Sequence, residues 1–133
     1  MTRKAKILRY NDSGDIALCI DVENWKVILE FLTRSDQHKK KFQYIVKHIF
    51  NRLKNRDIYD KEEISDKAKG VTAMKFFKGR SNDRIYCREM TLGDKTFVVI
   101  AAELLEKKKN KKINQKQRNL IEKVGSYEYE IIE

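Results

Sequence analysis

Alternating apolar and polar positions mark a three-stranded unit in the second half of the chain. Residues 72–78 and 84–90 alternate, and residues 96–104 are apolar almost throughout. The two segments between them, 79–83 and 91–95, contain the Gly, Ser, Asn and Asp residues that favour turns. The pattern predicts an antiparallel meander in which the all-apolar run is a central strand.

Helical periodicity precedes this meander. Apolar residues recur at helical spacing in residues 25–34, after Asp21 and Asn24, which are suitable helix caps. A second and longer amphipathic pattern runs from residue 35 or 36 to about residue 56. The sequence therefore predicts two consecutive helices.

The ends of the chain carry shorter signals. Residues 5–10 and 16–22 flank a polar turn segment, which predicts a hairpin or a strand followed by a loop. Residues 57–69 are polar and acidic, and we expect a loop or a short irregular helix there. Residues 114–124 predict a short helix that the following glycine can end, and the alternation in residues 127–132 predicts a last short strand or a tail.

This order of elements predicts an α+β protein. We expect a small twisted antiparallel sheet with the two N-terminal helices packed on one face, and a C-terminal helix. A length of 133 residues is typical of a single domain, here residues 1–133.

Positive charge is concentrated on the predicted meander and its exit. The whole chain has a net charge of +10, and residues 75–118 contain thirteen Lys or Arg against five Asp or Glu. A sheet with one cationic side is typical of a surface that binds a polyanion. The composition favours nucleic acid, an anionic membrane surface or an acidic protein as the partner.

Other classes are disfavoured by features that the sequence lacks. No apolar run reaches the ~18 residues of a membrane span, and the N-terminus has no uninterrupted apolar signal core. We therefore expect a cytoplasmic protein with no membrane partner. Cys19 and Cys87 stand in apolar surroundings and are interpreted as buried thiols. Without Cys and His at ligand spacing, we expect no metal or other cofactor.

Three short motifs follow one another along the meander and its exit. They read Ala73-Met74-Lys75, Asp83-Arg84-Ile85 and Leu105-Glu106-Lys107-Lys108-Lys109-Asn110-Lys111. They resemble the RelE/HigB-type toxins of bacterial type II toxin–antitoxin modules, most closely the phage-derived branch of the RelE/ParE superfamily. That branch has Glu-Leu-Arg, Tyr-Arg-Ile and Phe-x-Lys-Lys-x-x-Lys at these places, so here the first motif lacks the acid and has Lys for Arg. The second keeps its Arg, and the third keeps its three Lys but has Leu105 in place of Phe. The resemblance covers residues 70–118, and the preceding helices only by order and length.

The resemblance implies a fold, an activity and a set of partners. Such toxins have a RelE-like fold and are ribosome-dependent endoribonucleases, which cut mRNA in the ribosomal A site and so inhibit translation. Each is neutralised by a cognate antitoxin, often a helix-turn-helix protein, and reaches operator DNA only through it. We therefore expect a metal-independent mRNA endonuclease whose partners are mRNA, the ribosome and an antitoxin.

Cleavage of RNA by its own 2′-hydroxyl needs a base for that hydroxyl, stabilisation of the phosphorane and an acid for the 5′-oxygen. We assign Arg84 as the phosphate clamp because its guanidinium has a planar fork of donors and stays charged. Lys75 lies in the predicted strand before Arg84, and the turn at residues 79–83 separates the two. We expect Lys75 to lie opposite Arg84 in the sheet, where it would stabilise the negative charge of the phosphorane. Glu103, near the end of the all-apolar run, is the candidate base. The alternative is that Arg84 forms a surface ion pair, Lys75 is a solvated strand residue and Glu103 only neutralises nearby lysines.

A second set of residues is expected to hold the RNA. Tyr86 or Phe77 is the candidate for stacking on a base, although both patterns also fit core positions. The predicted cationic contacts are Lys78, Arg80, Lys107, Lys108 and Lys111. The lysine run has the strongest case because like charges so close together repel one another unless a polyanion relieves them, but a solvated tail is the alternative.

Two other functions fit the same pattern. One is a non-catalytic ParE-like toxin directed at DNA gyrase. The other is a plain nucleic-acid-binding domain, which would show salt-dependent binding without growth arrest. We rank both below the endoribonuclease.

Overall fold

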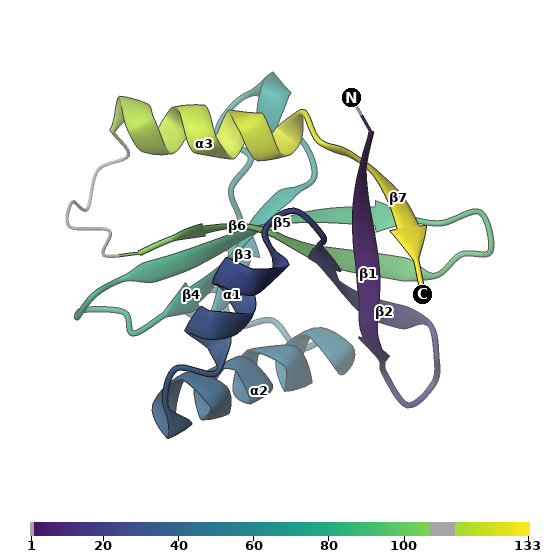
Figure 1. Cartoon of the computed structure of the whole chain (residues 1–133), viewed down its shortest axis with the longest axis horizontal. Coiled ribbons are helices and arrows are strands. Elements are labelled where there is room, and N and C mark those ends of the chain that lie inside the picture. Colours follow the sequence, from purple (N-terminus) through teal and green to yellow (C-terminus); the bar gives the residue numbers. More distant parts are fainter. Residues whose placement is uncertain (1, 107–113) are drawn as a thin grey trace.

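The computed structural model describes residues 2–106 and 114–133, which form an open sheet with helices on both faces (Figure 1). The strands described are β1 (Thr2–Tyr10), β2 (Ile16–Asp21), β3 (Tyr59–Lys61), β4 (Val71–Phe76), β5 (Asp83–Thr91), β6 (Phe97–Leu105) and β7 (Glu128–Ile132). The helices described are α1 (Trp25–Leu32), α2 (Asp36–Phe50) and α3 (Gln115–Gly125), and Asp66–Ala68 form a 3-10 turn. The α+β class predicted from the sequence is confirmed.

The described strands make one mixed seven-stranded sheet in the order β3-β4-β5-β6-β2-β1-β7. The meander β4-β5-β6 is antiparallel as predicted, but β2 runs parallel to β6 and β7 runs parallel to β1. The prediction of a small antiparallel sheet is therefore wrong in size and in strand direction. The order and direction of the strands could not be predicted, because the backbone hydrogen bonds between strands do not depend on side-chain identity. The alternation within one strand therefore does not indicate which strand pairs with it.

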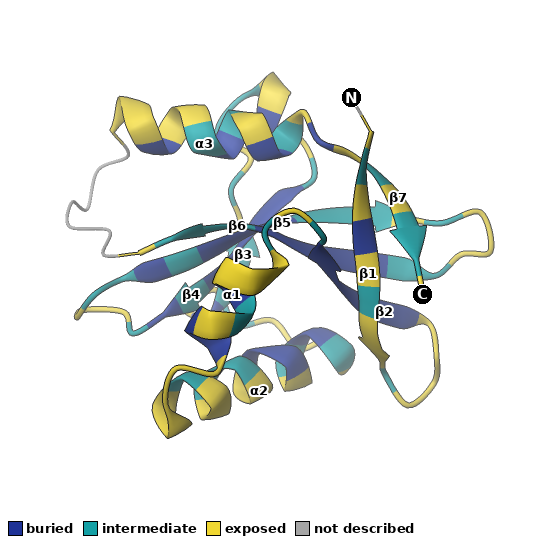
Figure 2. Ribbon diagram, viewed as in Figure 1, coloured by how far each residue is buried: buried dark blue, intermediate teal, exposed yellow. Residues whose placement is uncertain are grey.

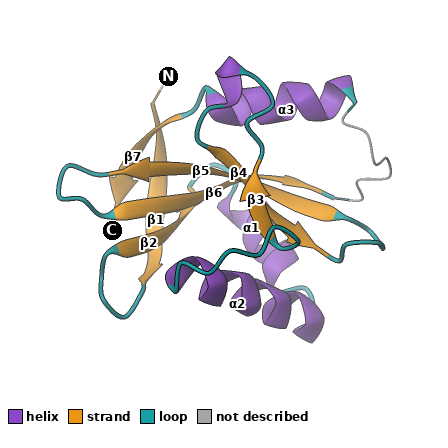
Figure 3. Cartoon of the chain, turned by 180° about the vertical axis from the view of Figure 1, so that it is seen from behind, coloured by secondary structure: helices purple, strands orange, loops and turns teal. Residues whose placement is uncertain are grey.

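Helices α1 and α2 pack on one face of the sheet (Figure 3). Apolar side chains of both helices, among them Phe31 and Ile45, join Leu18 and Met74 from the strands in the largest core cluster. The β1-β2 hairpin predicted at residues 5–10 and 16–22 is confirmed and precedes the two helices, so the helices are not at the N-terminus of the domain. This hairpin and β7 extend the sheet beyond the predicted meander.

The end of α2 differs from the prediction. The helix stops at Phe50 rather than near Arg56, and Arg52 then takes φ = 54°, in the left-handed region that a helix does not use. As a consequence Leu53, an apolar residue within the predicted amphipathic helix, is 55% exposed.

Helix α3 covers the opposite face above β4, β5 and β6 (Figure 1). It begins with a capping box, in which the side chain of Asn114 accepts from the N–H of Gln117 and the Gln117 side chain accepts from the N–H of Asn114. The helix ends at Gly125, where a Cβ atom would lie 2.0 Å from the carbonyl oxygen of Lys67. The predicted C-terminal helix is confirmed, and its last residue is a glycine because the 3-10 turn segment lies against it.

The two edges of the sheet were predicted with different success. The short strand β3 lies in the stretch expected to be a loop and pairs with β4. At the other edge β7 confirms the predicted last strand, and its parallel pairing with β1 places the first and last strands of the chain side by side (Figure 1).

Burial is greatest in the central strands (Figure 2). Every residue of β2 is buried, and Cys19 and Cys87 are buried free thiols as predicted. Among the described helices, none has the length and apolar character needed to span a membrane.

Candidate functional site

Lys75 and Arg84 lie side by side on the face of the sheet that carries α3. They are direct cross-strand partners on β4 and β5, so their side chains point to the same face with Cβ atoms ~5 Å apart. The next pair on that face, Ala73 and Tyr86, packs beneath α3. The predicted position of Lys75 opposite Arg84 is confirmed.

A β-bulge places Glu103 on the same face. In the pairing of β5 with β6, Tyr86 lies opposite Glu103 and Cys87 lies opposite Ala101, so Ala102 between them has no cross-strand partner. Ala102 nevertheless packs in the core beneath α3, and Glu103 accepts a hydrogen bond from the hydroxyl of Tyr127 in that core. Two consecutive residues therefore face the same side, which a regular strand does not allow. The bulge thus brings Glu103 to the side of the sheet that holds Arg84.

The guanidinium of Arg84 has donors without acceptors. Its Nε and Nη1 atoms are both buried, and no described residue accepts a hydrogen bond from either. A buried donor that lacks an acceptor costs about 1–3 kcal/mol, and most buried polar groups in proteins are hydrogen-bonded. The geometry therefore suits an anionic ligand, whose oxygens would accept these N–H groups.

Lys75 is held toward the edge of the sheet. Its Nζ donates to the carbonyl oxygen of Arg56 at 3.0 Å and lies 4.0 Å from Oδ2 of Asp60. The side chain is 18% exposed. Lys75 is thus positioned to place its positive charge beside Arg84.

Glu103 keeps one oxygen free of the hydrogen bonds formed by the described residues. Its Oε2 accepts from Tyr127, and burial raises the pKa of Tyr127, with a further contribution from Glu103, so the phenol keeps its proton. Its Oε1 accepts no hydrogen bond from the described part of the chain. Oε1 is thus the atom that a reacting hydroxyl would approach.

Lys78 and Arg80 follow β4 at the end of the sheet where Lys75 and Arg84 lie. Lys78 forms an exposed ion pair with Asp57 at 2.6 Å, which lowers the pKa of Asp57. Arg80 is exposed in the β4-β5 turn and lines a shallow pocket of about 280 Å³. Both side chains are open to a large ligand.

The assignment of Tyr86 to base stacking is wrong. The residue is 1% exposed and packs beneath α3, and burial raises its pKa to about 12. The alternative reading of Tyr86 as a core residue is the correct one. Phe77 is half-buried, with its ring centroid 4.8 Å from that of His38. Lys107, Lys108 and Lys111 lie outside the described residues.

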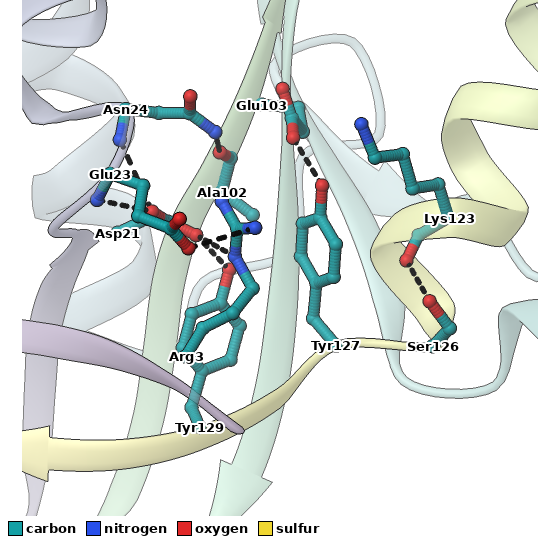
Figure 4. A network of polar contacts seen from close by, with 10 residues as sticks. All are labelled: Arg3, Asp21, Glu23, Asn24, Ala102, Glu103, Lys123, Ser126, Tyr127 and Tyr129. Carbon is teal, nitrogen blue, oxygen red and sulfur yellow. Dashed lines mark hydrogen bonds and ion pairs between the residues drawn. The ribbon is translucent and has the colours of Figure 1, made fainter. Parts of the chain in front are cut away.

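Sequence reasoning missed a buried polar network that ties β1, β2, β6 and β7 together (Figure 4). At its centre the fully buried Asp21 accepts from Arg3 Nε at 2.8 Å, from Tyr129 at 2.6 Å and from two backbone N–H groups. The guanidinium of Arg3 also lies 4.0 Å from the ring centroid of Tyr127. Asp21 was interpreted only as a helix cap, because its partners are distant in the sequence.

Among the described residues, no three His, Cys, Asp or Glu side chains are grouped so as to hold a metal ion. No protein-family model, curated protein or solved structure matches this chain.

Proposed function

We propose that this chain is an endoribonuclease that binds a phosphodiester of RNA at Arg84. The observation that carries the proposal is the guanidinium of Arg84, whose Nε and Nη1 are buried without an acceptor among the described residues, directly opposite the cation of Lys75. Two adjacent cations on one side of a sheet favour a phosphate, and guanidinium is the group best suited to binding it.

The same face carries the groups that a cleavage step needs. The Oε1 atom of Glu103 takes the proton of the 2′-hydroxyl, and the 2′-oxygen attacks the phosphorus. The N–H groups of Arg84 and the charge of Lys75 stabilise the phosphorane. The bond to the 5′-oxygen then breaks, and that oxygen takes a proton from an acid or from solvent. The products are a 2′,3′-cyclic phosphate and a 5′-hydroxyl.

The biological setting follows from the resemblance and belongs to the same proposal. The chain would act as the toxin of a toxin–antitoxin pair in the cytoplasm, cutting mRNA on the ribosome until a small antitoxin, of the helix-turn-helix kind, binds it. What supports this setting is the order α1-α2-β3-β4-β5-β6-α3, in which the meander that carries the motifs follows two helices and precedes a third.

A second candidate function is RNA binding without cleavage. It is favoured by the hydrogen bond from Tyr127 to Glu103 and by the engagement of Lys75 with Arg56 and Asp60. These contacts engage one oxygen of Glu103 and the ammonium of Lys75, whereas the buried Nε and Nη1 of Arg84 have no acceptor among the described residues.

Incubation of the purified protein with a ribosome-bound mRNA, followed by primer extension, tests the proposal. The unmodified protein should leave cuts in the A-site codon with 2′,3′-cyclic phosphate ends, and Arg84→Ala should slow cleavage by about 100-fold or more. Arg9→Ala is the matched control, because it removes one positive charge from exposed β1 and should cleave normally. Uncut mRNA that still binds through Arg84 would select the second candidate, and unchanged cleavage by Arg84→Ala would contradict both.

A further inference from the structure

A pocket of about 480 Å³ lies on the other face of the sheet, between the end of α2 and the edge strand β3. Its walls are apolar and include Ile49, Phe97 and the exposed side chain of Leu53. A volume of this size is typical of a site for a small organic ligand. The pocket exists because α2 stops at Phe50, so that the following segment leaves the sheet uncovered.

The floor of this pocket is a chain of polar groups. The hydroxyl of Thr72 donates to the phenol oxygen of Tyr59 at 2.8 Å, and the phenol donates to Oε2 of Glu89 at 2.6 Å. Burial raises the pKa of Tyr59, with a further contribution from the Glu89 charge, so the phenol stays a donor. Within the described chain, Oε1 of Glu89 accepts no hydrogen bond. A carboxylate is thus oriented in the pocket, and both of its oxygens keep a lone pair for a ligand, since among the described residues only Tyr59 donates to Oε2.

The rim of the pocket is cationic. Arg52, Lys54, Arg56 and Lys61 all line it, against the acids Asp60 and Glu89. All four side chains are exposed. Arg52 pairs with Asp15 at 3.1 Å and Lys61 with Glu63 at 3.9 Å, which leaves Lys54 and Arg56 without an ion pair among the described residues. Positive charge around an apolar cavity favours a ligand that has both a flat apolar body and an anionic group.

We propose that this pocket binds a guanine nucleotide, with its base against Glu89 and its phosphate at Arg52, Lys54 and Arg56. An ionised carboxylate accepts hydrogen bonds and donates none. Of the four RNA bases only guanine presents two adjacent N–H donors, N1–H and the 2-amino group, on its Watson–Crick edge. The other three place an acceptor beside each donor, which the carboxylate would repel.

Lys75 connects the rim of this pocket to the site at Arg84, its cross-strand partner. Lys75 donates to the carbonyl oxygen of Arg56, a rim residue, and approaches Asp60, which also lines the pocket. A single-stranded RNA could therefore place one phosphate at Arg84 and a guanine at Glu89. This connection rests on the proposed function, whereas a free guanine nucleotide would need the pocket alone.

Calorimetric titration with GMP, IMP and AMP tests the pocket independently of cleavage. GMP should bind more tightly than AMP, and more tightly than IMP, which lacks the 2-amino group, by about 5- to 100-fold. Glu89→Gln should abolish this preference while keeping the fold, because the amide oxygen still accepts from Tyr59. Glu128→Gln, a neutralised carboxylate on exposed β7, is the matched control and should bind GMP normally. Equal affinities for the three nucleotides, or an unchanged preference in Glu89→Gln, would overturn the assignment.

Competition by a short single-stranded RNA with one guanine separates the two sources of the base. Displacement of GMP that weakens with added salt supports a base within an RNA strand. GMP binding that this RNA does not compete with supports a free nucleotide as the ligand and removes the link to Arg84. Cleavage of an RNA without guanine reports on Arg84 separately, so failure of the pocket and failure of the nuclease can be told apart.

Discussion

Arg84 is the residue on which the candidate site depends. Its cross-strand position beside Lys75 follows from the β4-β5 register, but its buried Nε and Nη1 atoms have no acceptor among the described residues. A protein that retains such a group forgoes stability at that position, as functional sites often do.

Replacing Arg84 by an apolar side chain of similar length should therefore separate stability from function. We expect Arg84→Met to leave the free energy of unfolding unchanged or to raise it by about 1–2 kcal/mol, while RNA binding is lost. Urea unfolding monitored by circular dichroism measures the first effect, and salt-dependent RNA titration measures the second.

Arg88 provides the comparison for this substitution on the same strand. Its Nη1 donates to the carbonyl oxygen of Lys69 at 2.5 Å, so Arg88→Met should destabilise the protein by about 1 kcal/mol. If Arg84→Met destabilised as much as Arg88→Met, the unpaired donors of Arg84 would have no energetic significance.

At the scale of elements, the contact between α3 and the 3-10 turn fixes the layer above the site. The capping box of Asn114 starts α3, and Gly125 ends it against the backbone of Lys67 and Ala68. The sequence predicted both ends of this helix from local signals. It did not predict β3, because three residues are too few to show alternation, nor the bulge at Ala102, because a bulge is defined by the partner strand.

A methyl group at Gly125 should disturb this layer. The Cβ atom of Gly125→Ala would lie 2.0 Å from the carbonyl oxygen of Lys67, and backbone must shift to relieve the overlap. We expect a loss of about 1–3 kcal/mol in the free energy of unfolding, measured by urea denaturation. Gly93→Ala is the matched control, because no atom lies within 4 Å of its Cβ position, and its effect should stay within about 0.5 kcal/mol. Equal effects at the two glycines would contradict the packing described for α3.

At the scale of the whole molecule, burial in the central strands keeps several acidic groups protonated. Burial raises the pKa of Cys19 in β2 and of Tyr86 in β5 to about 12, from ordinary values of 9.0 and 10.0. Each group binds its proton more tightly in the folded state than in the unfolded state. Their contribution to the free energy of unfolding is therefore complete below pH ~9 and is lost as the pH rises toward ~12.

Thermal unfolding between pH 8 and 11 should follow this prediction. The melting temperature should fall above pH ~9, and the double substitution Cys19→Ala and Tyr86→Phe should make the fall shallower. Tyr10→Phe, at a residue that is 46% exposed, should leave the slope unchanged. A melting temperature in the double variant that falls as steeply as in the unmodified protein would contradict burial as the cause.

The sequence by itself determined the helices, the meander β4-β5-β6 and the placement of Lys75 opposite Arg84, because these depend on periodicity, caps and turns that neighbouring residues encode. Only the tertiary structure decided which strands flank the meander, that Tyr86 is buried, and that Asp21 joins Arg3 and Tyr129. The tertiary structure also decided the bulge at Ala102, which brings Glu103 to the face of the sheet that carries α3, and the pocket around Glu89. Each of these depends on contacts between segments far apart in the chain, and the free energy of such contacts is set by packing and by shared hydrogen bonds rather than by the local pattern.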